Sequence, residues 1–188
     1  MKKISLLALF LLGSMSYNTI SAQERVVTRG IEVATNGYMP EIGVMAPDFL
    51  STDNDMNEVN LSSFRGKKVV LNIFPSLDTP TCALSVRQFN AEAASLENTV
   101  VLCISKDLPF AQSRFCSVEG LERVIPLSVF RSESFDNSYG LIITEGPLRG
   151  LATRAVIVLD ESGKIIYRQI IRNVSEEPDY RSAVEILK

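Results

Sequence analysis

This 188-residue chain contains, one directly after another, Val69-Val-Leu-Asn-Ile-Phe74, Pro75-Ser-Leu-Asp-Thr79-Pro-Thr-Cys82 and Ala83-Leu-Ser-Val-Arg-Gln-Phe89. The first block is short and apolar, which is typical of a buried strand, and the last repeats apolar residues at helical spacing. The middle block is a turn rich in Pro and Thr. The sequence therefore predicts strand, turn and helix in succession, with Cys82 in the first turn of the helix.

The position of Cys82 favours a reactive thiol. Backbone N–H groups without partners and the helix dipole both stabilise an anion at a helix start, and the thiolate is the reactive form of cysteine. The alternative is a small core residue, which is what a lone cysteine beside an apolar helix usually is. Two neighbours favour the reactive interpretation: Thr79 can direct its hydroxyl at the sulfur, and Pro75 restricts the chain as it leaves the strand.

The composition limits what can activate such a thiol. The chain has no histidine, which excludes Ser-His-Asp and Cys-His catalysis. Its three cysteines are dispersed and offer no paired ligands for zinc, so no metal or other cofactor is expected. A net charge of −3 gives no indication of nucleic-acid binding. Activation must therefore come from Arg, Lys, hydroxyl groups or a helix dipole.

The N-terminus has the pattern of a secretory signal peptide. Two lysines precede the apolar stretch Ile4–Leu12, and small residues end at Ala22, where cleavage is expected. Residues 1–22 would then be removed and residues 23–188 would form one domain, exported to a periplasm and without stable membrane insertion. The apolar stretch is short for a membrane span. An uncleaved anchor and a cytoplasmic location remain the alternatives.

The rest of the chain predicts an α/β domain. A small hairpin is expected around Arg29-Gly30, and Asp107 is expected to cap a helix that Gly120 ends. The expected elements are a hairpin at 25–34, short strands at 49–50 and 59–61, a strand at 69–74, a helix at 80–96, a strand at 99–104, a helix at about 107–119, a mixed segment at 126–150, a second hairpin at 154–171 and a helix at 178–187. This order suits a mixed central sheet with flanking helices, which is the thioredoxin-like fold.

Several segments resemble one family. The pattern Pro75-x-x-x-Thr79-x-x-Cys82 is that of the peroxiredoxins. From about residue 25 onward the chain closely resembles the bacterial thiol peroxidases, the atypical two-cysteine peroxiredoxins with an intramolecular disulfide. The segments that carry this resemblance are Asn72-Ile-Phe-Pro-Ser-Leu-Asp-Thr79, Val101-Leu-Cys-Ile-Ser105, Asp107-Leu-Pro-Phe-Ala-Gln-Ser-Arg-Phe-Cys116, Glu145-Gly-Pro-Leu-Arg-Gly-Leu151 and Glu177-Pro-Asp-Tyr180. The N-terminal extension is a departure from most members.

The resemblance implies a set of roles. Cys82 would attack hydrogen peroxide or an organic hydroperoxide, and Cys116, which is 34 residues further along, would resolve the resulting sulfenic acid. Thr79 would hydrogen-bond the sulfur or the peroxide. Arg154 would complete the site, although the residues alone suggest a surface arginine at a strand start. Cys103 lies in an apolar strand and is expected to be an inert core residue. The family also implies a homodimer and recycling by thioredoxin or a thioredoxin-like reductant.

Two classes of function follow from this sequence. The first is a thiol-dependent peroxidase in antioxidant defence. The second is a thioredoxin-fold thiol redox switch, or a redox-responsive binding protein, without significant turnover. A switch needs only the pair of cysteines, whereas Thr79 and Arg154 beside Cys82 favour the enzyme.

Overall fold

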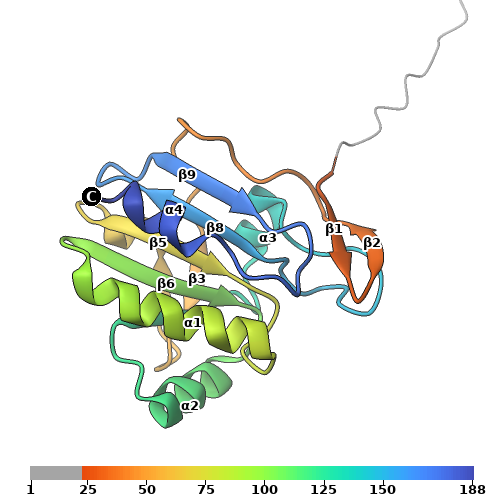
Figure 1. Ribbon diagram of the computed structural model, residues 1–188, viewed down its shortest axis with the longest axis horizontal. Coiled ribbons are helices and arrows are strands. Elements are labelled where there is room, and N and C mark those ends of the chain that lie inside the picture. Colours follow the sequence, from red (N-terminus) through yellow and green to blue (C-terminus); the bar gives the residue numbers. More distant parts are fainter. Residues whose placement is uncertain (1–22) are drawn as a thin grey trace, which may run out of the picture.

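The computed structural model describes residues 23–188, and it consists of one large sheet, one small sheet and flanking helices (Figure 1). The large sheet has seven strands in the order β4-β3-β7-β6-β5-β8-β9. The strands are β1 (Arg25–Thr28), β2 (Ile31–Ala34), β3 (Leu50–Thr52), β4 (Glu58–Asn60), β5 (Lys68–Ile73), β6 (Thr99–Ser105), β7 (Val124–Ser128), β8 (Ala155–Leu159) and β9 (Ile165–Ile170). The small sheet is the antiparallel hairpin of β1 and β2.

The centre of the large sheet is parallel. Strands β5, β6 and β7 run in the same direction, and the crossovers between them are α1 (Pro80–Glu92) and α2 (Pro109–Glu119). Strand β8 joins the other side of β5 in the antiparallel sense, and β9 pairs with β8. Strands β5 and β8 are covered on both faces, which explains why their sequences are almost continuously apolar. The predicted mixed sheet and N-terminal hairpin are confirmed.

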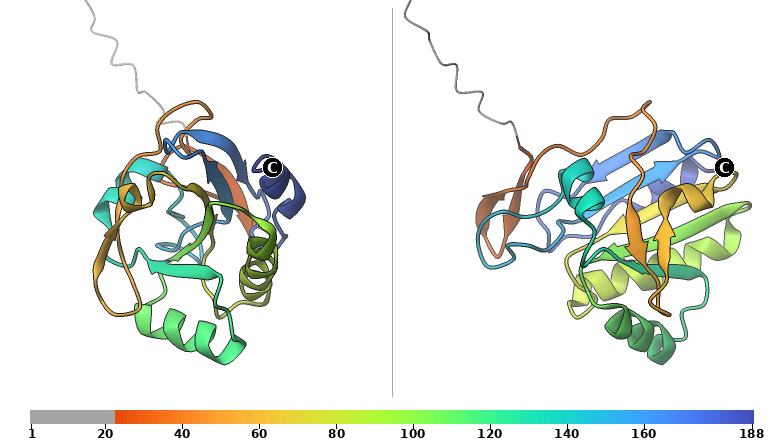
Figure 2. Two further views of the ribbon diagram at one scale, coloured as in Figure 1. Left: turned by 90° about the vertical axis from the view of Figure 1, so that its left-hand side faces the viewer. Right: turned by 180° about the vertical axis from the view of Figure 1, so that it is seen from behind.

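Helices cover both faces of the large sheet (Figure 2). On one face, Val86 and Phe89 of α1 pack with Ala183 of α4 (Tyr180–Glu185) against the sheet. On the other face, Phe135 and Tyr139 of α3 (Glu133–Tyr139) form the larger apolar core together with residues of β5, β6 and β8. The start of α1 therefore lies at the carboxyl end of a strand that is buried on both sides.

The structure corrects three details of the sequence prediction. Helix α1 ends at Glu92 and is followed by a single 3-10 turn, so the helix predicted over 80–96 is shorter. Asp107 does not cap α2; Leu108 occupies the N-cap position, and the Asp107 carboxylate binds other groups instead. Helix α3 was not predicted, although Ser132 caps it with its side chain and Gly140 ends it in the left-handed conformation.

The predicted signal peptide, residues 1–22, lies outside the described residues. Among residues 23–188, no helix has both the length and the apolar character that crossing a membrane requires.

Candidate active site

Cys82 lies one turn into α1, just beyond the end of the central strand β5. The chain leaves β5 at Ile73 and passes Pro75, and Thr79 takes the N-cap position with extended backbone angles of φ −118° and ψ 142°. Pro80 begins the helix, where its missing N–H removes no helical hydrogen bond. The Cys82 side chain is only 1% exposed. The local sequence thus places a thiol among the unpaired N–H groups of a helix start, as predicted.

Arg154 contacts Cys82 from the residue just before β8, the strand beside β5. It precedes β8, and because β8 is antiparallel to β5 in a register that pairs Ala155 with Ile73, Arg154 lies beside the turn that follows β5. Its Nη2 atom donates a hydrogen bond to Cys82 Sγ at 3.1 Å, and its Nε atom donates to the carbonyl oxygen of Val174 at 2.9 Å. The interpretation of Arg154 as a surface residue is wrong, because the side chain is 1% exposed.

The guanidinium has one donor group left over. The Nη1 atom of Arg154 is buried and has no hydrogen-bond partner among the described residues. A buried, charged donor without a partner is costly unless an anion or a polar ligand meets it. Arg154 is therefore arranged to hold the sulfur with one nitrogen and a second negatively charged or polar atom with another.

Thr79 lines the same pocket but does not bond the sulfur. Its Oγ1 donates to the carbonyl oxygen of Ser76 at 3.0 Å, so its proton is committed to the loop before α1. The hydroxyl oxygen then keeps its lone pairs, which makes it an acceptor for an O–H group in the pocket. The expected hydrogen bond from this hydroxyl to the sulfur is therefore absent among the described residues, and the bond to the Ser76 carbonyl orients the hydroxyl instead.

A pocket of about 180 Å³ gives access to Cys82. Pro75, Leu148 and Leu151 contribute apolar surface to its wall, and Arg29 from the hairpin of β1 and β2 also lines it. Arg29 and Val174 were not identified from the sequence, because residues so distant along the chain meet only through the tertiary fold. Leu148 and Leu151 do lie in a segment that carries the family resemblance.

Cys116 lies apart from this pocket. It is near the C-terminal end of α2, is 9% exposed and lines a different hollow together with Asn54 and Gly120. Burial raises the pKa of the Cys116 thiol. All three cysteines are free thiols in this structure. The structure therefore brings Pro75, Thr79, Cys82 and Arg154 together but leaves Cys116 outside the pocket.

Cys103 is a buried residue of the apolar core. It lies in β6 and is 1% exposed, and its hydrogen-bond contact among residues 23–188 is a long one of 3.8 Å from Nδ2 of Asn72. Burial also raises the pKa of this thiol. These surroundings agree with the prediction of a core cysteine.

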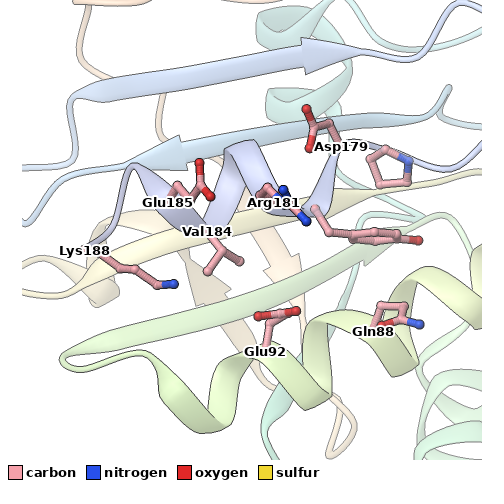
Figure 3. Close-up of a pocket in the computed structure, with 9 residues that line it drawn as sticks. Gln88, Glu92, Asp179, Arg181, Val184, Glu185 and Lys188 are labelled. Carbon is pink, nitrogen blue, oxygen red and sulfur yellow. The ribbon is translucent and has the colours of Figure 1, made fainter.

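Another hollow lies between α1 and α4 (Figure 3). It has a volume of about 520 Å³, with Glu92 on the side of α1 and Arg181, Glu185 and Lys188 on the side of α4 (Figure 3). It contains no thiol and is open to solvent. Within residues 23–188, no cluster of three cysteine or carboxylate side chains could hold a metal ion. The chemistry of the described residues is therefore concentrated at Cys82.

A thioredoxin-like sheet that presents a thiol at a helix start, with a buried arginine on the sulfur, defines the peroxiredoxin class of redox proteins. Comparison with known proteins agrees. The Redoxin family profile matches residues 41–184. A thiol peroxidase from Corynebacterium glutamicum is 52% identical over 159 residues, which is 85% of this chain and 96% of the relative.

Solved structures extend the comparison. A peroxiredoxin-like protein from Aquifex aeolicus superposes with a TM-score of 0.82 at 34% identity, covering 87% of this chain and 95% of the other. A thiol peroxidase from Chromobacterium violaceum shares the fold with a TM-score of 0.80 at 24% identity, over 87% and 95% of the two chains. The chain belongs to the Redoxin family, within it to the bacterial thiol peroxidases, and it is a peroxiredoxin enzyme.

Proposed function

We propose that this enzyme reduces hydrogen peroxide and organic hydroperoxides by using Cys82 as the nucleophile and Cys116 as the resolving thiol. The observation that carries the proposal is the 3.1 Å contact between Arg154 Nη2 and Cys82 Sγ at the base of an accessible pocket. A guanidinium donor on the sulfur can stabilise negative charge during the reaction, and a structural core cysteine has no need of one.

In the first step the Cys82 thiolate attacks one peroxide oxygen, and the O–O bond breaks. The sulfur gains that oxygen and becomes a sulfenic acid, while the other oxygen takes a proton and leaves as water or an alcohol. Arg154 Nη1, which has no partner among the described residues, is suited to stabilise the charge that develops on the oxygens. Thr79 Oγ1 is suited to accept the O–H of the bound peroxide, because its own proton is held by Ser76.

In the second step Cys116 attacks the sulfenic sulfur, a disulfide forms, and water leaves. Because Cys116 lines a different hollow from Cys82, we expect the start of α1 and the end of α2 to rearrange before the two sulfurs meet. The position of Cys116 at the end of α2, four residues before the left-handed Gly120, suits such local unwinding. A dithiol reductant of the thioredoxin type would then return both thiols.

The assembly and the location are part of the same proposal. The resemblance to thiol peroxidases supports a homodimer. The pattern of residues 1–22 supports export to a periplasm, where a reductant that is itself exported must regenerate the enzyme, since that compartment keeps thiols oxidised. Fractionation of the native host followed by N-terminal sequencing tests export. A full-length chain in the cytoplasm would contradict the location and leave the chemistry untouched.

A coupled assay tests the reaction itself. Residues 23–188 are incubated with peroxide and a thioredoxin-like reductant, and consumption of reductant is followed. Turnover supports the peroxidase, whereas one stoichiometric oxidation without turnover with any reductant supports the redox switch. Peptide mapping after one equivalent of peroxide tests the pairing, and a Cys82–Cys103 bond or only intermolecular bonds would contradict the resolving role of Cys116.

A further inference from the structure

Asp107 links the loop before α1 to the start of α2. Its Oδ1 atom accepts a hydrogen bond from Ser76 Oγ at 2.7 Å, and its Oδ2 atom accepts one from the backbone N–H of Leu77 at 2.8 Å. Oδ2 also accepts a hydrogen bond from Ser105 Oγ at 2.8 Å. One half-buried carboxylate thus satisfies three donors from two segments, and bonds to a charged acceptor are the stronger kind.

On the loop side, the network ends at the hydroxyl of Thr79. Asp107 holds both the side chain of Ser76 and the N–H of Leu77, which limits how the peptide between these two residues can rotate. The oxygen of that peptide is the Ser76 carbonyl, which accepts from Thr79 Oγ1 at 3.0 Å. The orientation of the Thr79 hydroxyl in the Cys82 pocket therefore depends on Asp107.

On the other side, the network reaches the helix that carries Cys116. Ser105 Oγ, which donates to Asp107, accepts a hydrogen bond from Nε2 of Gln112 at 3.0 Å. Gln112 is fully buried and lies four residues before Cys116, on the same face of α2. The polar chain therefore extends from three residues before Cys82 to four residues before Cys116.

We propose that Asp107 is a positioning residue that favours the peroxide step over the resolving step. While the network is intact, it aligns Thr79 for the peroxide and keeps α2 folded against the sheet. Resolution requires the loop and α2 to separate, and this polar chain opposes that separation. The inference rests on the proposed roles of Cys82 and Cys116, and it adds a determinant of the balance between the two steps.

The test compares Asp107→Asn with Asp160→Asn. An amide has nearly the same shape as the carboxylate, but its NH₂ group is a donor facing donors, so the three bonds of Asp107 cannot all form. Asp160 is a matched control because its carboxylate also accepts three hydrogen bonds, from Ser162 N, Ser162 Oγ and Lys164 N, at the far end of β8 from Arg154. Stopped-flow measurements on the reduced enzyme separate sulfenic acid formation from disulfide formation.

We expect Asp107→Asn to slow the reaction with hydrogen peroxide by about 10- to 100-fold, because a misplaced polar contact has effects of that order. Disulfide formation should be unchanged or faster. Asp160→Asn should leave both rates within about two-fold of the wild type. Ser76→Ala, which keeps the carboxylate and its other two donors, should slow the same step, and the double variant should be no slower than Asp107→Asn alone because both changes break one path.

Three results overturn the inference. Equal slowing of both steps would mean that Asp107 only stabilises the fold, and an unchanged peroxide rate in both Asp107→Asn and Ser76→Ala would mean that Thr79 is aligned without them. Additive effects in the double variant would show that Asp107 and Ser76 affect the peroxide step independently of each other. A wild-type chain that forms no sulfenic acid would overturn the proposed function as well, so that failure is distinct. If Asp107→Asn does not fold, Ser76→Ala decides by the same split of the two rates.

Discussion

Cys82 and Cys103 are buried to the same extent, since each is 1% exposed, and both belong to the same apolar cluster, yet their polar surroundings differ. Cys82 is at a helix start with a guanidinium nitrogen 3.1 Å from its sulfur. Cys103 is inside a parallel strand, packed in the apolar core, and among the described residues its hydrogen-bond contact is a side-chain amide 3.8 Å away. Exposure alone therefore says little about a buried thiol. Charge, helix position and an adjoining pocket distinguish a reactive cysteine from a packing residue.

Cys116 is intermediate between them. No charged group among residues 23–188 pairs with its sulfur, and burial raises its pKa, as it does for Cys103. Unlike Cys103, it lies near the end of a helix. In the proposed mechanism Cys116 reaches the Cys82 sulfenic acid through local unwinding and not in a preformed site.

The largest expected effect comes from exchanging sulfur for oxygen at each of the two buried positions. Cys82→Ser should lower the rate of peroxide reduction by orders of magnitude, because the proposed nucleophile is lost. Cys103→Ser should keep most of the activity, since that sulfur is packed in the apolar core and does not line the Cys82 pocket. A coupled assay measures both. Residual turnover above about a tenth of the wild type in Cys82→Ser would be inconsistent with a nucleophilic role.

The contact of Arg154 with the sulfur predicts the next largest effect. Arg154→Lys should slow the peroxide step by about 10- to 100-fold, which corresponds to about 1.4–2.8 kcal/mol, because lysine lacks the planar set of donors that serves the sulfur and a second atom together. The resolving step should change much less. Pre-steady-state oxidation of the reduced enzyme measures this.

Arg168→Lys is a suitable control for that substitution. Arg168 also holds backbone oxygens, including the carbonyl of Pro40 at 3.1 Å, but it lies on β9 away from the pocket. An equal loss in both variants would mean that arginine at position 154 contributes to stability and not to the reaction.

The buried Cys103 thiol should make the free energy of unfolding depend on pH in the alkaline range. The Cys103 thiol stays protonated in the fold because burial raises its pKa. In the unfolded chain the same thiol ionises at about pH 8.5. Unfolding then releases a proton, so the free energy of unfolding should fall as pH rises above that value, by up to about 1.4 kcal/mol per pH unit for each such thiol.

Cys103→Ser removes one of these thiols and should therefore reduce the alkaline slope. Denaturant titrations of the reduced protein between pH 7 and pH 10, an interval of about three units around the thiol pKa, measure it for both chains. The slope, rather than the absolute stability, is the quantity to compare, because serine in an apolar strand lowers stability at every pH. Identical slopes would contradict the contribution of Cys103.

The smallest effect is expected at the exposed ion pair that joins α1 to α2. Arg87 donates to both carboxylate oxygens of Glu119 at 2.8 Å, and these hydrogen bonds hold the pKa of Glu119 below its ordinary value. Glu119→Gln should accelerate disulfide formation by about two- to five-fold at low salt, because the ion pair restrains α2, which must loosen for the disulfide to form. The effect should be small because exposed ion pairs contribute little to stability.

High salt should diminish that difference, since it screens the pair in the wild type. Glu58→Gln is the control, as Glu58 of the edge strand β4 forms an exposed pair with Arg131 that involves neither α1 nor α2. Slower disulfide formation in Glu119→Gln would indicate that the pair guides α2 toward Cys82 instead of restraining it.

Local sequence patterns predicted most of the elements and the position of Cys82 at a helix start. The run 69–74 became β5, and Cys82 lies in the first turn of α1 because apolar spacing, Thr79 and Pro80 are all properties of neighbouring residues. Helix α3 was missed, since its caps, Ser132 and Gly140, bound only two turns and its apolar residues do not form a long periodic pattern.

Contacts across the sheet required the tertiary structure. Sequence alone, without the family resemblance, favoured a surface position for Arg154, and only the antiparallel register of β5 and β8 brings it 3.1 Å from Cys82. In the same way Asp107 has the local pattern of a helix cap, but three other donors from two segments surround its carboxylate in the fold. Local spacing determines which residues form a helix start, whereas long-range pairing determines which charges meet there.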